Sequence, residues 1–318
     1  MESVLETTKF VVDKSHYVKI KNKPIKEFCK NFSESHINHW LNESPFDFRK
    51  LNEKEKLNFL LVFNAISFSY WGEPKWTIDY KGEKFDGAGG MIASIGKAIE
   101  KNKPILNSVY LKNISEKDFA EILKGNVKIP LFAEWLKILR EIGQIIVRDF
   151  NGEFENLVKK SNGDALKLLE LILKHFPSFN DFSPYKGKMI YFQKRAQLLV
   201  ADIYQMFQGK KYGEMKNLDK ITACADYKLL MVLRNMGILE YAKELEKKID
   251  NKKEILKDSK EEVEIRANTI YANELIKKEL RKKIKKIDSI HVNDHLWLLG
   301  QIKSPKNKPY HLTRTTSY

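Results

Sequence analysis

The sequence predicts a mainly α-helical fold, with many helices and one small β-hairpin. Apolar residues recur at helical spacing in most segments after residue 51. Serine or aspartate precedes several of these segments and glycine or proline follows them, as is usual at helix ends. No linker divides the 318 residues. We therefore expect a single domain over residues 1–318, which can be built as two helical lobes with the site between them.

The composition is that of a soluble globular protein, with 42% hydrophobic and 31% charged residues. No apolar run approaches the ~20 residues needed to span a bilayer. The amino terminus has no basic segment followed by an apolar one, so we expect no secretion signal. Because Cys29 and Cys224 are the only cysteines, a cytoplasmic location is expected rather than a disulfide framework.

The net charge of +15 indicates an anionic partner, which could be a phosphate, a nucleotide or a nucleic acid. Residues 277–286 hold seven basic residues and one acidic residue. Their apolar residues continue the core side of a preceding helix, so this run is interpreted as a solvated helical face. Nucleic-acid binding is therefore not the favoured interpretation.

The first elements are short. Residues 1–30 are interpreted as one strand or short helix plus turns. A helix is expected over 51–71, ending in an aromatic cluster that contains Phe68 and Trp71. Two β-prone stretches flank a Lys-Gly turn within residues 76–87 and predict the hairpin, which can wall a pocket beside these aromatics.

Glycines at 87, 89 and 90 open the next expected helix, over residues 91–102. Such glycines can bring backbone N–H groups close to a phosphate. Their spacing matches neither the P-loop nor the dinucleotide fingerprint, so tight helix packing is the favoured explanation.

Residues 115–177 predict a series of scaffold helices. Ser115 is the expected cap of the first and Gly125 its stop; the second follows Pro130, and the third ends before Pro177. Residues 176–185 are interpreted as a loop.

Two helices after this loop carry polar residues that packing alone does not explain. In the first, Phe192, Ala196 and Leu199 begin a buried stripe, and Lys194, Arg195 and Asp202 lie close to its edge. One interpretation is that Arg195 and Asp202 belong to a line of ion pairs.

In the second helix, Asp226 precedes an apolar run that ends at Gly237, which is the pattern of an N-cap and a glycine stop. The simplest interpretation is that Asp226 is only a cap. The alternative is a functional carboxylate held against free backbone N–H groups.

The remaining chain contains one long helix and a tail. Ser259 and Glu262 form an S-x-x-E capping box for a helix expected to reach about residue 286. His291 and His295 lie four residues apart, but the Glu of HExxH is absent and no third ligand is evident, so no metal is expected. The pair His36 and His39 gives no signal either.

Several segments resemble the queuosine salvage protein family, the queuosine 5′-phosphate nucleosidases, and they occur in register along nearly the whole chain. They are residues 67–71, 85–100, 129–143, 176–182, 191–204, 221–241, 261–276, 295–297 and the closing HLTRTTSY at 311–318. The resemblance implies a helical fold similar to that of helix-hairpin-helix DNA glycosylases. It also implies hydrolysis of the bond between queuine, a 7-deazaguanine base, and ribose 5-phosphate, releasing the base for reuse in tRNA.

The resemblance implies a set of site residues and no cofactor. Asp226 is the expected catalytic carboxylate, because cleavage of an N-glycosidic bond passes through a ribosyl cation. Its contacts with a helix start are expected to lower its basicity and so to favour electrostatic stabilisation. Asp202 or Asp294 is the alternative, for catalysis or for binding the base. The expected substrate-binding residues are Lys194, Arg195, Asp202, Tyr227, Lys228, Phe68, Trp71, Asp294, Trp297, His311 and Arg314.

The chain departs from the family pattern at several positions. Asn293 stands where the family commonly has an aspartate, with Asp294 one place later, and Leu298 replaces an acidic residue. Lys228 replaces an arginine, which keeps the charge and loses bidentate geometry. Arg266 matches a family arginine, although the sequence alone suggests a surface or ion-pair residue.

Two other functions stay open at this point. A helical nucleic-acid glycosylase or binding protein agrees with the charge, but the sequence has no Gly motif of the L-P-G-V-G kind. A catalytically silent interaction protein would leave the polar residues of 194–228 unexplained. The expected partner is a small nucleotide, without a membrane, and the oligomeric state is not predicted.

Overall fold

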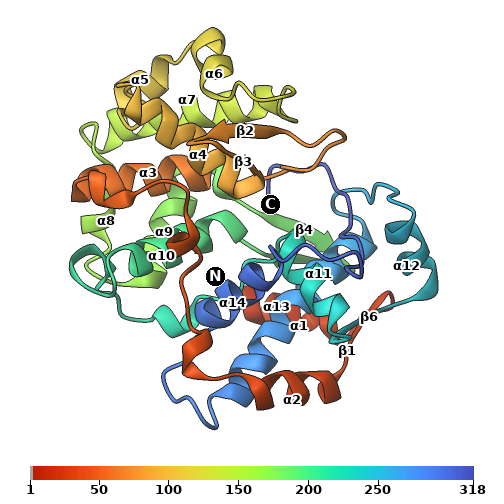
Figure 1. The fold of residues 1–318 in the computed structure, drawn as a ribbon. Coiled ribbons are helices and arrows are strands. Elements are labelled where there is room, and N and C mark those ends of the chain that lie inside the picture. Colours follow the sequence, from red (N-terminus) through yellow and green to blue (C-terminus); the bar gives the residue numbers. More distant parts are fainter. Residues whose placement is uncertain (1–2) are drawn as a thin grey trace. The chain divides into compact units, whose positions relative to one another are not determined.

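The computed structural model describes residues 3–318, which divide into two compact units (Figure 1). The division falls within one helix, α10 (Lys194–Met206). The first unit comprises Met1–Asn42, Asp181–Gln197 and Leu218–Tyr318, and the second comprises Glu43–Asn180 and Leu198–Asn217.

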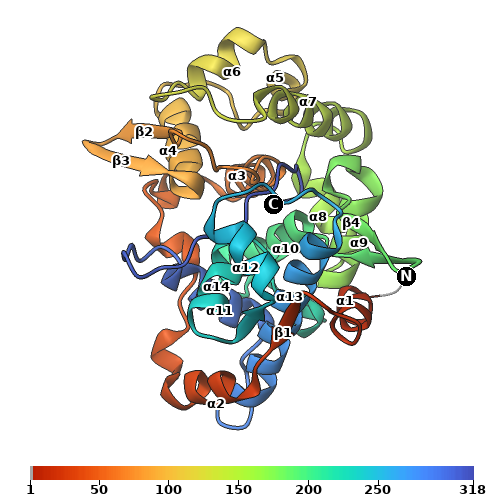
Figure 2. The same ribbon diagram turned by 90° about the vertical axis from the view of Figure 1, so that its right-hand side faces the viewer.

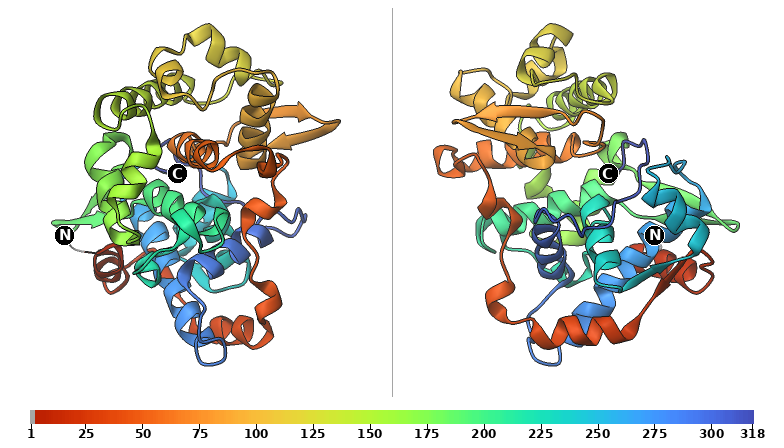
Figure 3. Two further views of the ribbon diagram at one scale, coloured as in Figure 1. Left: turned by 90° about the vertical axis from the view of Figure 1, so that its left-hand side faces the viewer. Right: turned by 45° about the vertical axis from the view of Figure 1, so that its right-hand side comes forward.

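The first unit is organised around α13 (Lys260–Leu280), which contacts α1, α2, α11 and α14. Figure 3 shows α2, in red, beside this helix. Apolar residues from α2, α11, α13 and α14 form one buried cluster that includes Leu229, Ile265 and Leu296, while Val4 and Val11 of α1 pack in a second cluster. The other helices of this unit are α1 (Val4–Val12), α2 (Asn22–Asn31), α11 (Tyr227–Asn235), α12 (Lys243–Asp250) and α14 (Ser289–Leu299).

Two antiparallel strand pairs complete the first unit. Strands β1 (Val18–Ile20) and β6 (Leu239–Tyr241) pair with Val18 opposite Tyr241. Strands β4 (Phe182–Tyr185) and β5 (Lys188–Tyr191) form a hairpin with a Lys186-Gly187 turn, both residues at positive φ.

The second unit is a helical assembly with one hairpin. Strands β2 (Thr77–Tyr80) and β3 (Glu83–Asp86) lie alongside α4, as Figure 2 shows. A Cβ on Gly90 would lie 2.9 Å from the Trp76 ring and 3.1 Å from the Phe85 carbonyl oxygen, so the glycine permits this packing. The helices are α3 (Glu53–Ala65), α4 (Gly87–Glu100), α5 (Ser108–Asn113), α6 (Glu116–Ile122), α7 (Phe132–Asp149), α8 (Phe154–Lys160) and α9 (Ala165–His175).

Several sequence predictions are confirmed. The fold is mainly helical, and the 76–87 hairpin has its Lys-Gly turn at Lys81 and Gly82. Ser115 caps α6 by accepting from the Asp118 backbone N–H at 3.0 Å. Packing accounts for Gly90, as expected. In residues 3–318 no helix combines the length and apolar character needed to cross a membrane.

Other predictions are wrong. The structure has a second hairpin, β4–β5, where a loop was expected, because Pro184 concealed a second Tyr-Lys-Gly turn signal. The long helix ends at Leu280 rather than near residue 286, and the lysines that follow lie largely outside it. Helices α2, α5, α8 and α12 were not predicted, and all four are short. Short 3₁₀ helices occupy Glu34–His36, Trp40–Glu43, Phe48–Lys50, Pro177–Phe179, Lys211–Gly213 and Leu218–Lys220.

Candidate active site

Asp226 is the N-cap of α11, as the sequence predicts. Its Oδ1 accepts hydrogen bonds from the backbone N–H groups of Lys228, at 2.9 Å, and Leu229, at 3.1 Å. Gly237, at φ +69°, follows the helix. The carboxyl group is therefore fixed by two backbone donors in the first turn of a helix.

The acidity of Asp226 differs from the sequence expectation. The residue keeps some exposure to solvent, but protein atoms surround its carboxyl group. Desolvation by burial raises the pKa of Asp226 above its ordinary value, although Lys194 and the two backbone N–H groups oppose this shift. The expectation of lowered basicity is wrong, because it counted the hydrogen bonds and omitted burial.

Lys194 is the charged neighbour of this carboxylate. It begins α10 and is 3% exposed, and its positive charge is the main influence that lowers the Asp226 pKa. Its backbone N–H donates to Asp181 Oδ2 at 3.1 Å. Arg195, the next residue, is equally buried, and its charge lowers the pKa of Asp181. The structure thus places a buried cation beside the candidate catalytic group.

Asp181 and Arg266 form a buried ion pair near these residues. Arg266 donates from both terminal nitrogens to the two Asp181 carboxylate oxygens, at 2.9 and 2.6 Å. Its guanidinium also lies over the rings of Phe192, at 3.9 Å, and Tyr318, at 4.4 Å. Burial alone would raise the pKa of Asp181, but the charge and hydrogen bonds of Arg266, the Lys194 backbone N–H and the Arg195 charge together leave that pKa below its ordinary value. The surface interpretation of Arg266 is wrong and the ion-pair interpretation is confirmed.

Tyr318 links this ion pair to the end of the chain. Its hydroxyl donates to Glu262 Oε1 at 2.9 Å and hydrogen-bonds His311 Nε2 at 2.8 Å. Burial raises the pKa of Glu262 and lowers the pKa of His311 to about 3. His311 is therefore uncharged at neutral pH, and because the one Tyr318 hydroxyl proton goes to Glu262, His311 Nε2 donates to the Tyr318 oxygen.

The closing segment packs against Tyr227, the residue after Asp226. The Tyr227 hydroxyl donates to the Thr313 carbonyl oxygen at 2.8 Å. Its ring lies 5.4 Å from the rings of Tyr310 and His311 and 4.9 Å from that of Tyr318. The closing segment is therefore packed against the start of α11. Arg314 has a half-exposed side chain 3.5 Å from Glu254.

Lys228, in the first turn of α11, connects this helix to the end of α14. Its Nζ donates to the Gly300 carbonyl oxygen at 2.9 Å, at the end of α14. Its charge also lowers the Asp226 pKa, after the larger effects of Lys194 and the backbone. A single ammonium donor suffices for this contact.

Asp294 and Trp297 lie on α14. The Asp294 carboxylate accepts from His39 Nδ1 at 2.9 Å and from Asn293 Nδ2 at 3.1 Å. The Trp297 ring lies 5.1 Å from that of Trp40. Asn293 Oδ1 in turn accepts from the Cys224 backbone N–H at 2.9 Å. The departure at Asn293 thus has a structural role, because this residue ties α14 to the segment that leads into Asp226.

His39 is the residue of this group that sequence reasoning missed. It lies outside any periodic segment, and its carboxylate partner is 255 positions away along the chain. The other histidines have separate environments: His291 Nδ1 accepts from the Asp288 N–H at 3.0 Å, and the His295 ring packs on Phe32. Within residues 3–318 no group of three His, Cys, Asp or Glu side chains is arranged to hold a metal ion.

Three of the expected site residues belong to the second unit. Asp202 is buried, and its Oδ2 accepts from Asn64 Nδ2 at 2.9 Å. Phe68 packs against Trp135 with ring centroids 5.3 Å apart, and Trp71 is 7% exposed. The remaining expected residues belong to the first unit, where Asp226, Tyr227 and Lys228 are consecutive and Lys194 is close.

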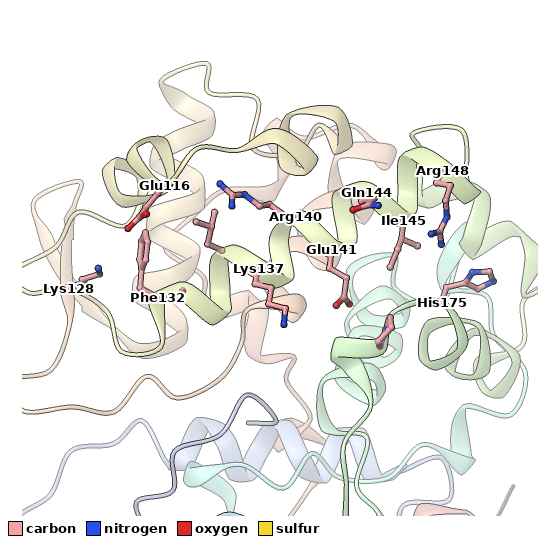
Figure 4. A pocket seen from close by; sticks show the side chains of 13 residues that line it. Glu116, Lys128, Phe132, Lys137, Arg140, Glu141, Gln144, Ile145, Arg148 and His175 are labelled. Carbon is pink, nitrogen blue, oxygen red and sulfur yellow. The ribbon is translucent and has the colours of Figure 1, made fainter.

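A hollow of about 710 Å³ in the second unit is a separate feature (Figure 4). It runs along α7 and has several cationic side chains, but these are engaged within the protein. Arg140 donates twice to the Ile114 carbonyl oxygen, at 2.9 and 2.7 Å, and Arg148 pairs with Asp149 at 2.7 Å. None of the expected site residues lines this hollow.

Comparison with known proteins agrees with this arrangement. Residues 48–318 match the model of a family described as queuosine salvage protein. A queuosine 5′-phosphate N-glycosylase/hydrolase of Sphaerobacter thermophilus is 36% identical, over 99% of this chain and 97% of its own length. The proteins of the same name from Mus musculus and Schizosaccharomyces pombe are 34% and 30% identical, over 84% and 79% of this chain and 83% and 77% of their own lengths. The chain belongs to the queuosine salvage protein family.

Proposed function

We propose that this protein hydrolyses the N-glycosidic bond of queuosine 5′-phosphate, releasing queuine and ribose 5-phosphate so that queuine can be salvaged for tRNA. The observation that carries the proposal is the fixed carboxylate of Asp226 with the buried cation of Lys194 beside it. Relatives that carry this activity in their names match almost the whole chain. The protein is accordingly an N-glycosyl hydrolase that acts on a nucleotide.

Asp226 supplies the negative charge that the reaction needs. As the bond from C1′ to the base nitrogen breaks, positive charge develops on the ribosyl ring, and a carboxylate at C1′ stabilises it. Because burial raises its pKa, the carboxylate is also a better proton acceptor than an exposed one. It can therefore orient the attacking water and take its proton. The charge of Lys194 favours the ionised form of this carboxylate against the effect of burial.

The anionic end of the substrate requires donors and positive charge. Lys194, Arg195 and Arg314 supply positive charge. These residues suit a 5′-phosphate through charge-assisted hydrogen bonds. The aromatic side chains of Tyr227 and Trp297 suit a flat heterocyclic base.

The proposal also covers the domain organisation, the cellular location and the type of substrate. The 318 residues act as one nucleosidase domain on a scaffold similar to that of helix-hairpin-helix DNA glycosylases. We place the protein in the cytoplasm, since Cys29 and Cys224 are both free and buried. The substrate is a free nucleotide rather than a nucleic acid, and the reaction needs no metal.

The test is to offer purified protein queuosine 5′-phosphate, queuosine and GMP in parallel, with a queuosine-containing tRNA as a fourth arm. Release of queuine from the nucleotide alone supports the proposal. Release from the intact tRNA, with no activity on the free nucleotide, would favour a nucleic-acid glycosylase instead.

A further inference from the structure

His39 is held in a way that leaves one ring nitrogen available. Its Nδ1 lies 2.9 Å from Asp294 Oδ2, and its side chain is only 12% exposed. Its Nε2 is buried and has no hydrogen-bond partner within the described part of the chain. A buried polar atom without a partner is costly, so this nitrogen is suited to meet a group that arrives with a ligand. The residue lies before the stretch that matches the family model, which begins at residue 48.

Asp294 determines which nitrogen of His39 is available. Its side chain is 3% exposed, and its carboxylate also accepts from the Trp40 backbone N–H, at 3.4 Å, and from Asn293. Since the carboxylate can only accept, Nδ1 of His39 carries a proton in both charge states of the ring. Gain and loss of a proton therefore take place at Nε2. These contacts also mean that Asp294 serves the imidazole rather than the base.

The pair is connected to Asp226 through hydrogen bonds. Asn293 bonds Asp294 through its amide nitrogen and the Cys224 backbone N–H through its amide oxygen. Cys224 stands two residues before Asp226. Other groups around the ring are the edge of Trp40, at 6.1 Å, and His291, whose pKa is lowered in part by the His39 charge. Asp294 is the acidic neighbour of the His39 ring.

The mechanism proposed above does not yet include a group that donates a proton to the leaving base. The 7-deazaguanine base has carbon where guanine has N7, so the leaving base cannot be protonated at that position. The departing electron pair has to be neutralised at another atom of the base. Asp226, which faces the water in the proposed mechanism, cannot serve both ends of the reaction at the same moment.

We propose, on the basis of the function proposed above, that His39 is this donor and that Asp294 positions it. The bond between C1′ and the base nitrogen breaks, its electron pair goes to the base, and the Nε2 proton of the His39 imidazolium ends on a base nitrogen. The water oxygen bonds to C1′, and its proton goes to Asp226. Exchange with solvent then returns a proton to His39 and removes one from Asp226.

The test uses His39→Asn, whose amide can still donate to Asp294 but has no atom at the Nε2 position. The matched control is His36→Asn, because His36 is a neighbouring histidine that caps the backbone N–H of Ser33 at an exposed site. General acid catalysis contributes about 10²- to 10⁴-fold. We expect His39→Asn to lower kcat by at least about 10²-fold, with KM within a few-fold and the control unchanged.

The pH profile separates proton donation from a structural role. The parental kcat should fall at alkaline pH as the imidazolium loses its proton, and this fall should be absent in His39→Asn. A variant that keeps at least a third of the parental kcat, or that is slow but keeps the alkaline fall, would overturn the proposal. If His39→Asn does not fold, His39→Gln is judged by the same two criteria. A parent protein that releases no queuine would instead refute the proposed function.

Discussion

The substitution Asp226→Asn separates a helix cap from a catalytic carboxylate. Asn keeps an oxygen that can accept the N–H groups of Lys228 and Leu229, now 2.9 and 3.1 Å from Asp226 Oδ1. As a cap alone, the change should alter the free energy of unfolding by a few tenths of a kcal/mol. Removal of a well-placed charge stabiliser typically lowers kcat by about 10²- to 10³-fold, which corresponds to about 2.7–4 kcal/mol. We expect the larger effect.

The chain provides a matched control for this substitution. Asp164 caps α9 by accepting from the Lys167 backbone N–H at 3.0 Å, and this bond lowers its pKa. Asp164→Asn makes the same chemical change at a cap in the scaffold. Steady-state kinetics should show an unchanged kcat for this variant. A kcat for Asp226→Asn within a few-fold of the parent, in a folded and binding-competent protein, would refute the catalytic assignment.

Thermal or denaturant unfolding at two pH values gives a second measure of the same residue. The folded-state pKa of Asp226 is raised, so its contribution to stability is present at low pH and is lost as the pH rises through that pKa. Asn cannot ionise. Relative to the parent, Asp226→Asn should therefore have a larger free energy of unfolding at pH 7 than at pH 4. The opposite trend would show that the carboxyl group is stabilised in its ionised form.

Three further predictions follow from the same contacts. Queuosine 5′-phosphate should have a much larger kcat/KM than queuosine, because the phosphate finds cationic partners, and equal values would remove the phosphate site. Tyr318→Phe removes the hydrogen bonds to Glu262 Oε1 and His311 Nε2 and should lower stability by about 1–3 kcal/mol, whereas Tyr110→Phe, which removes a buried hydroxyl without a partner, should be near neutral in the same unfolding assay. Exhaustive chelation should leave the rate unchanged, and a loss of activity that zinc restores would contradict this.

Local signals in the sequence were reliable where one short segment determines the structure. Asp226 and Gly237 bracket α11 as predicted, because a cap and a left-handed stop are properties of a few adjacent residues. The turn of the second hairpin has a local signal of the same kind, because Tyr185, Lys186 and Gly187 repeat the Tyr-Lys-Gly sequence of the first. Pro184 lies within β4 itself, because proline is tolerated in an edge strand.

Contacts between distant segments could not be predicted. His39 meets a carboxylate 255 positions away, and Arg266 meets Asp181 across 85 positions. Neither pair has a spacing that periodicity can detect. The raised pKa of Asp226 is a result of the same kind, because desolvation depends on which segments surround the carboxyl group. The resemblance to a family supplied the candidate site residues, while the partners that hold them required the structure.

The most direct test of the central claim is to quantify both products from one incubation of the purified protein with queuosine 5′-phosphate. We predict that queuine and ribose 5-phosphate accumulate in equal amounts, and that Asp226→Asn forms both at least about 10²-fold more slowly. Release of inorganic phosphate with the glycosidic bond intact, or no release of queuine at all, would contradict it.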